Sequence, residues 1–257
     1  KLVKNNTEAP YADDVAGKGN NEGKGNIGIY AASGKTVHYK DGTFKTYNDY
    51  GVKDSIANPG KIEAVTESNR GISRDGIGVY SEGTVKLEGT TDIKLKAGST
   101  GENTGIFAKG TGAKVTLKTG KDSNNKLYSQ IEIDGKKTDN TKTNKGIGLF
   151  SQNGGEITAD GTVLGKGLKV TIKDGASAMV STGTNSKINA KYSTIDYDGN
   201  GYAVYTKDGG KIDISNGEII LRGKSTAMEI DKSVGTNPVT FTGGKIKVMS
   251  NDVIVYN

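Results

Sequence analysis

Apolar and polar residues alternate along many short segments of the chain. Residues 84–88 and 92–96 are typical, because Val85, Leu87, Ile93 and Leu95 alternate there with polar side chains. Strict alternation with a period of two predicts β-strands that are buried on one face only. Glycines separate the segments and provide tight turns between them.

A segment rich in glycine and aromatic residues precedes each such pair of strands. It is clearest at residues 76–81, 146–151 and 201–206. Equivalent positions of its later copies, Val180, Tyr205, Ile230 and Val255, recur every 25 residues. A period of 20–50 residues is typical of stacked repeat proteins, in which each unit buries its apolar face against the next unit. We therefore expect three short strands in each repeat.

Three strands per repeat favour a coil in which each strand pairs in parallel with its equivalent one turn away. The predicted fold is an all-β, parallel β-helix (a solenoid) with three short strands per turn and about eight turns. It would form a single domain over residues 27–257, after an irregular lead-in at residues 1–26. A meander of hairpins is disfavoured because it would need a second sheet to cover its apolar face.

Extra residues interrupt the repeat near residues 41–60, 121–129 and 135–145. The first interruption contains either a hidden turn of the solenoid or a long loop. Insertions in repeat proteins often carry the binding function. Four aromatic residues in or beside the first interruption are therefore candidate ligand-binding residues, namely Tyr39, Phe44, Tyr47 and Tyr50. Their rings suit sugars and protein partners, or alternatively pack down on the coil.

The glycine and aromatic strand could face the core with either of its two sides. We expect an aromatic column and a neighbouring glycine column to face inward, because residues of opposite parity include Glu229 and Asp252. The aromatic column is Tyr30, Tyr80, Phe107, Phe150, Val180, Tyr205, Ile230 and Val255, and the glycine column includes Gly28, Gly78, Gly105 and Gly148. Ile29, Val79, Ile106, Leu149 and Val204 would then form an unusual apolar stripe outside. The reverse orientation, with the tyrosines outside, stays open.

The composition supports strands and turns and excludes several kinds of chemistry. The 257 residues include 39 glycines and 3 prolines, without tryptophan or cysteine, so disulfides, thiolate chemistry and cysteine metal sites are excluded. The net charge of +6 is interspersed with acidic residues, which favours a solvated surface rather than a nucleic-acid partner. No segment is apolar enough to span a bilayer. Because the chain begins at Lys1 without a methionine, we expect it to be an excised or processed piece.

Candidate catalytic and metal-binding residues are few. His38 is the only histidine, so a catalytic triad and a zinc site are not expected. Residues 196–201 are similar to the start of a calcium loop, but Lys207 stands where such a loop has its glutamate, which favours a turn. Asp196 and Asp198 share one strand face, without a second acidic pair. We expect no catalytic residue, metal or cofactor.

The repeats Gly-Ile-Gly-Val-Tyr-Ser at 76–81, Gly-Ile-Gly-Leu-Phe-Ser at 146–151 and Gly-Tyr-Ala-Val-Tyr-Thr at 201–206 carry a resemblance to a known family. With the glycine turn and the Lys-Ile-x-Ile type strand that follow, they resemble passenger repeats of type V autotransporter adhesins. The bias towards Lys, Asn, Gly and Thr is similar to that of large fusobacterial outer-membrane autotransporters. The resemblance covers roughly residues 25–257. Because the family shares no ligand motif, it assigns no binding residue.

This resemblance implies a right-handed β-helix that is secreted and displayed outside the bacterial cell. Contact with the outer membrane would be made only through a translocator barrel that is not part of this chain. The expected function is that of a non-enzymatic adhesin passenger segment that attaches to host cells or other bacteria. Its partner would be a surface protein or a glycan. The alternatives are a β-helical polysaccharide lyase or hydrolase, and a passive stalk without its own ligand.

Overall fold

The computed structural model describes residues 26–39, 43–48, 52–54, 62–66, 76–97, 103–136, 140–231, 238–249 and 254–256. These residues are all-β and form one 15-stranded and one 7-stranded sheet. β4 (Val52–Asp54) pairs with β5 (Ile62–Thr66) in antiparallel fashion, whereas the other named strands pair in parallel. The predicted all-β fold of parallel strands is confirmed. In the described part of the chain, no helix is long and apolar enough to cross a membrane.

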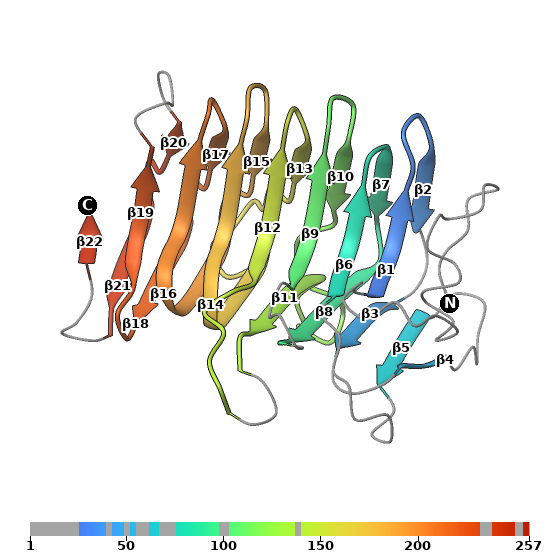
Figure 1. Ribbon diagram of the computed structural model, residues 1–257, viewed down its shortest axis with the longest axis horizontal. Coiled ribbons are helices and arrows are strands. Elements are labelled where there is room, and N and C mark those ends of the chain that lie inside the picture. The colour runs from blue at the N-terminus through green and yellow to red at the C-terminus, as the bar shows by residue number, and fades with distance from the viewer. Residues whose placement is uncertain are drawn as a thin grey trace.

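The strands lie in three rows of parallel neighbours, which we name by strand order within a repeat (Figure 1). The first row is β1 (Asn26–Ala31), β6 (Gly76–Ser81), β9 (Thr104–Lys109), β12 (Ile147–Gln152), the second halves of β14 (Lys169–Thr182) and β16 (Thr194–Lys207), β19 (Thr226–Ile230) and β22 (Ile254–Tyr256). The second row is the 7-stranded sheet, with β2 (Thr36–Tyr39), β7 (Thr84–Leu87), β10 (Lys114–Leu117), β13 (Glu156–Thr158), β15 (Lys187–Asn189), β17 (Lys211–Asp213) and β20 (Val239–Thr240).

The third row is β3 (Thr43–Asn48), β8 (Thr90–Lys96), β11 (Ser129–Asp134), the first halves of β14 and β16, β18 (Glu218–Arg222) and β21 (Lys245–Val248). β14 and β16 are long enough to belong to both the third row and the first row. They therefore join these two rows into the 15-stranded sheet.

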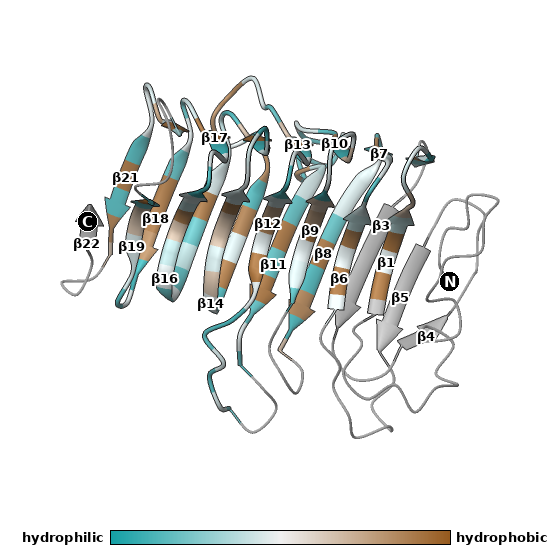
Figure 2. Cartoon of the chain, turned by 45° about the horizontal axis from the view of Figure 1, so that its top comes forward, coloured by the Kyte–Doolittle hydropathy of each residue, from teal (hydrophilic) through white to brown (hydrophobic). Residues whose placement is uncertain are grey.

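Equivalent residues of successive repeats stand next to one another in each row. Val85 pairs with Val115 in the second row, and Ile93 pairs with Ile131 in the third row. The alternation of apolar and polar residues along the strands is visible as alternating bands (Figure 2). Because each apolar residue lies beside another from the next repeat, the rows bury continuous apolar columns.

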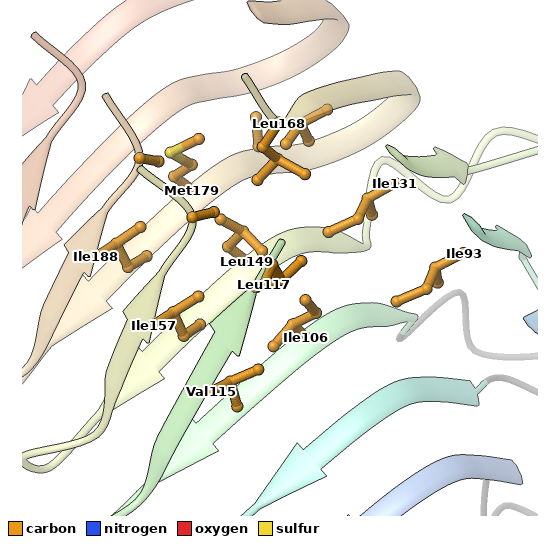
Figure 3. Close-up of a cluster of buried hydrophobic side chains, with 14 of the residues drawn as sticks. Ile93, Ile106, Val115, Leu117, Ile131, Leu149, Ile157, Leu168, Met179 and Ile188 are labelled. Atoms are coloured by element: carbon orange, nitrogen blue, oxygen red, sulfur yellow. The ribbon is translucent and has the colours of Figure 1, made fainter. Parts of the chain in front are cut away.

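The core lies between the rows. Figure 3 shows Ile106 of the first row, Val115 of the second and Ile131 of the third within one cluster of buried side chains. Their exposed fractions are 0–1%, and Val85, Leu87, Ile93 and Leu95 are buried as well. The inward residues that alternation predicts for the second and third rows are confirmed.

Glycines line the inside of the bend between the third and first rows. A Cβ atom added to Gly105 would lie 2.5 Å from the Gly148 carbonyl oxygen and 2.6 Å from Cγ2 of Ile131. Gly78 and Gly148 have equivalent close neighbours, and these three glycines are buried. The bend therefore needs a residue without a side chain in these repeats, and the predicted inward glycine column is confirmed there.

The predicted inward orientation of the aromatic column is wrong. Val79, Ile106 and Leu149 are 0% exposed, whereas Tyr80 and Phe107 are half-buried and lie on the outer side. The reason is the bend, because Gly78 and the next residue, Val79, both face the core and the alternation restarts between them. The tyrosines lie outside, as the alternative orientation required.

The spacing of 25 residues that we used to align the last repeats is also wrong, by one residue at Ile230 and by two residues at Val255. Tyr205 pairs with Glu229, so Glu229 rather than Ile230 continues the aromatic column. The turn after the first-row segment of β16 is shorter, since Thr182 pairs with Lys207 while Lys187 pairs with Lys211. Glu229 therefore does not mark the opposite face. Asp252 lies outside the described residues.

The interruption at residues 41–60 contains a regular strand. β3 pairs in parallel with β8 and supplies the third-row strand of the first repeat. β5 pairs with the other edge of β3, so the third row extends by one strand beyond the first repeat. The predicted lead-in at residues 1–26 lies outside the described residues, except for Asn26 in β1.

Candidate binding surface

The first row exposes an apolar outer face. We call two columns of outward side chains on β1, β6, β9 and β12 the first-row face. They form an aliphatic column that is interrupted by one threonine, and an aromatic column, and they are Ile27, Ile77, Thr104 and Ile147 beside Tyr30, Tyr80, Phe107 and Phe150. These side chains lie outside the hydrophobic core cluster, and all but Ile27 are half-buried. A contiguous apolar surface of this kind is typical of a binding site.

The aromatic column forms a stacked ladder, which we call the aromatic ladder. The ring centroids of Tyr30 and Tyr80 are 5.5 Å apart, those of Tyr80 and Phe107 are 5.3 Å apart, and those of Phe107 and Phe150 are 4.7 Å apart. The interplanar angles are 29°, 28° and 5°, respectively. Because the rings cover each other's faces, the ladder offers ring edges to a partner rather than open ring faces.

A carboxylate fixes the beginning of the aromatic ladder. The hydroxyl groups of Tyr30 and Tyr80 donate hydrogen bonds of 2.8 and 2.7 Å to the two carboxylate oxygens of Glu82. Hydrogen bonds to a charged acceptor are stronger than neutral ones. Glu82 therefore holds both rings in place and puts a negative charge at the rim of the first-row face.

Beyond Phe150 the outward column changes character. Val180 is 6% exposed, and the rings of Tyr202 and Tyr205 stack side by side with centroids 5.6 Å apart. Burial, together with the carboxylates of Asp231 and Glu229, raises the pKa of Tyr205. The apolar part of this face is therefore confined to the first four repeats.

The outer faces of the other two rows are charged. In the third row, Lys173 donates to Glu132 at 2.5 Å, and Arg222 donates to both carboxylate oxygens of Asp196 at 2.6 and 3.2 Å. These carboxylates raise the pKa of Lys173 and of Arg222. In the second row, Lys191 lies 3.6 Å from Asp213. The two columns of the first-row face thus differ from both neighbours because they contain no charged residue, and the charged side chains nearest to them, Glu82 and Lys109, lie at the rim.

The insertions after β10 and after β13 meet at one corner. The Thr119 hydroxyl donates to the Asp160 carbonyl oxygen at 2.7 Å, and the Gly120 amide donates to the Lys166 carbonyl oxygen at 2.6 Å. The ammonium group of Lys118 lies 3.9 Å from the centroid of the Tyr128 ring. The second of these insertions, at residues 159–168, was not predicted, because its residues show neither alternation nor a long polar run.

The insertion at residues 135–145 projects from the sheets below β11 and β12 (Figure 1). Lys136 and Lys142 face each other across an antiparallel bridge. The Lys142 ammonium group lies 2.5 Å from a carboxylate oxygen of Asp174, which raises the pKa of Lys142, and Lys136 lies 3.8 Å from the other oxygen. Asp174 is 8% exposed, so a buried carboxylate of the following repeat anchors this insertion.

The four predicted ligand-binding residues do not form a described site. Tyr39 is half-buried and packs against the hydrophobic core. Phe44 and Tyr47 belong to β3, but their side chains lie outside the described part, as does the whole of Tyr50. The prediction for these three residues stays a prediction. Sequence reasoning missed the first-row face because it placed the aromatic column inside.

The described residues offer little for metal or acid–base chemistry. No group of three His, Asp or Glu side chains in them could hold a metal ion. The His38 imidazole is 2.8 Å from Glu88, and both side chains are solvent-exposed on the second row. Tyr197, in the segment with Asp196 and Asp198, is 0% exposed and lies within β16, so this segment is a bent strand rather than the end of one.

Comparison of the chain with protein families, with curated proteins and with solved structures found no match.

Proposed function

We propose that this chain is a surface-displayed bacterial adhesin passenger segment that works outside the cell and attaches to host cells or other bacteria. The observation that carries the proposal is the apolar first-row face, which stands beside two charged faces. The resemblance of the repeats at 76–81, 146–151 and 201–206 to autotransporter passengers supports it. Secretion through a translocator barrel outside this chain belongs to the same proposal.

We further propose that the three rows belong to a right-handed parallel β-helix with three strands per turn and about eight turns. The pairing of each strand with its equivalent in the next repeat supports this architecture. The general preference of parallel crossover connections for the right hand supports the handedness. A β-helix would present the first-row face as a flat strip along a stiff rod.

A surface protein fits the first-row face better than a glycan does. Sugars that bind aromatic residues stack on ring faces, but the faces in the aromatic ladder are covered by neighbouring rings. Ring edges and isoleucine side chains suit the apolar side chains of a protein surface. A glycan would find an open site only at the ladder's ends or at the inserted loops.

The polysaccharide-processing alternative has less support in the described part of the chain. Glycoside hydrolysis needs two carboxyl groups that flank the bond and hold different protonation states. Both carboxylate oxygens of Asp196 accept hydrogen bonds from the Arg222 guanidinium, so this carboxylate already has a partner within the chain. The proposal therefore assigns no catalytic residue.

Cell binding by matched variants tests the proposal. Phe107→Thr removes a ring from the first-row face, while Lys86→Thr introduces the same residue on the exposed second row. Threonine is a good strand former at both positions. We expect retention of the labelled chain on host or bacterial cells to fall at least about tenfold for Phe107→Thr and to be unchanged for Lys86→Thr. Equal retention of the wild type and Phe107→Thr would contradict the assignment of the face.

A further inference from the structure

We propose that the first-row face binds a second copy of this chain, with the two aromatic ladders side by side and running in opposite directions. This inference goes beyond the proposed adhesion function, because two copies can associate in solution without any cell. It names one partner for the face, and it rests on the spacing of the ladder and on the charges at its rim.

The spacing of the ladder favours a partner with the same repeat. Successive rings stand 4.7–5.5 Å apart because their strands are neighbours in a sheet. Extended peptides repeat on one side about every 7 Å, so they fall out of step over four rings, whereas the turn of a helix, about 5.4 Å, is close to the ring spacing. A second aromatic ladder stays in step throughout its length, and sheets can pack face to face in this way.

The rim charges select the arrangement of the two copies. Ala32, Glu82, Lys109 and Gln152 follow one another in the outward column beside the aromatic ladder. A twofold axis that is parallel to the strands and passes between β6 and β9 places repeat one opposite repeat four, and repeat two opposite repeat three. Glu82 of each copy then meets Lys109 of the other copy.

The same axis pairs the rings without leaving one uncovered. Tyr30 faces Phe150 of the other copy, and Tyr80 faces Phe107. The adjoining aliphatic column matches in the same way, because Ile27 faces Ile147. Running the two ladders in the same order would need an axis along the ladder, which reverses the strands and carries the rim residues of the two copies to opposite sides of the interface, so that Glu82 no longer meets Lys109. Opposite order is therefore the complementary arrangement.

The size of the face predicts a weak complex. Four strands and five residues along each strand span roughly 19 by 16 Å, or about 300 Å² per copy. Stable interfaces bury about 800 Å² per partner, so a dissociation constant of about 0.1 mM is reasonable. Many copies displayed on facing surfaces would still hold together, because linked weak contacts gain strength from each other.

Exchange of the rim charges tests the proposal. Sedimentation velocity at concentrations up to about 1 mM should show a dimer of the wild-type chain. Lys109→Glu and Glu82→Lys should each weaken self-association at least about tenfold, because like charges then meet across the axis. An equimolar mixture of these two variants should dimerise again, since each copy supplies what the other lacks.

Further variants guard against a folding artefact. Phe107→Lys should abolish the dimer, and Lys86→Thr should leave it unchanged, with thermal unfolding compared for every variant. The proposal is overturned if the wild type stays monomeric, if either charge variant dimerises as well as the wild type, or if the mixture fails to dimerise. If the wild type stays monomeric but binds cells that lack this chain, the result would support adhesion and refute self-association. If the wild type forms a dimer but binds no cell, the result would support self-association and refute adhesion.

Discussion

A methyl group at Gly105 tests the close approach of the rows at the bend. The substitution Gly105→Ala places a Cβ atom 2.5 Å from the Gly148 carbonyl oxygen and 2.6 Å from Cγ2 of Ile131. Both contacts are about 1 Å too short for carbon. The carbonyl oxygen belongs to the neighbouring strand β12, and Ile131 is packed in the core, so neither atom can move away freely.

The expected cost follows from overpacking. Inserting a methyl group into a packed core costs about 3 kcal/mol when the surroundings cannot relax. Alanine restricts the unfolded chain more than glycine and returns about 0.7 kcal/mol. The net loss in the free energy of unfolding should therefore be about 2 kcal/mol. Ala178 and Ala203 occupy the same column in later repeats and are buried, so the column accepts a methyl group there, after the register shifts between β14 and β16.

Gly34→Ala is the matched control. Gly34 has a φ angle of 70°, and a Cβ atom there would meet nothing within 4 Å, so only backbone strain of about 1 kcal/mol is expected. Urea unfolding followed by circular dichroism compares the variants, and hydrogen exchange of the β9 and β12 amides locates the change. If Gly105→Ala costs no more than Gly34→Ala, the bend is not as close as described.

Three further predictions concern single side chains. The buried Tyr197 hydroxyl donates to the Ala176 carbonyl oxygen and accepts from the Gly201 amide. Burial raises its pKa, so the contribution of Tyr197 to stability should be constant below about pH 10 and be lost above it, and the alkaline fall in stability should be less steep in Tyr197→Phe. Alkaline unfolding curves of equal slope would contradict this. The Gly154 amide donates to the Ser186 hydroxyl, so Ser186→Ala should free this nitrogen to attack the side chain of Asn153 and speed deamidation there. Peptide mass spectrometry would show this, with Asn200 as the unchanged internal control. Asp174→Asn keeps the shape and the positive φ angle but removes the charge beside Lys142, so trypsin should cleave after Lys142 several times faster than in the wild type. An unchanged cleavage rate would show that the ion pair does not anchor the insertion.

The second and third rows could be predicted because their alternation is local. Val85 and Ile93 are buried as the period of two requires. The first row could not be oriented in this way, because two successive residues, Gly78 and Val79, face the core at the bend. No local pattern distinguishes such a bend from a regular strand. Because the turn after the first-row segment of β16 is one residue shorter than the one after β14, a constant spacing of 25 residues assigned Glu229 to the wrong column.

The candidate surface depended on the same orientation. Aromatic residues placed inside cannot form a binding face, so the sequence left only Tyr39 and its neighbours in the first interruption as candidates. Tyr39 packs on the core, and β3 occupies part of the interruption as a paired strand. The burial of the Tyr197 hydroxyl could not be predicted for a similar reason. Its position in the strand is equivalent to aliphatic positions in other repeats, and only the bend beside it supplies partners for a buried hydroxyl.

The orientation of the first row is the central claim, and the absence of cysteine makes it directly measurable. Single cysteines introduced by Val79→Cys, Tyr80→Cys, Ile106→Cys and Phe107→Cys can be treated with a maleimide under native conditions. The structure predicts fast labelling for Tyr80→Cys and Phe107→Cys, and labelling of Val79→Cys and Ile106→Cys only when the protein unfolds. Fast labelling at the two aliphatic positions, with protection at the aromatic ones, would place the aromatic ladder inside and contradict the proposed face.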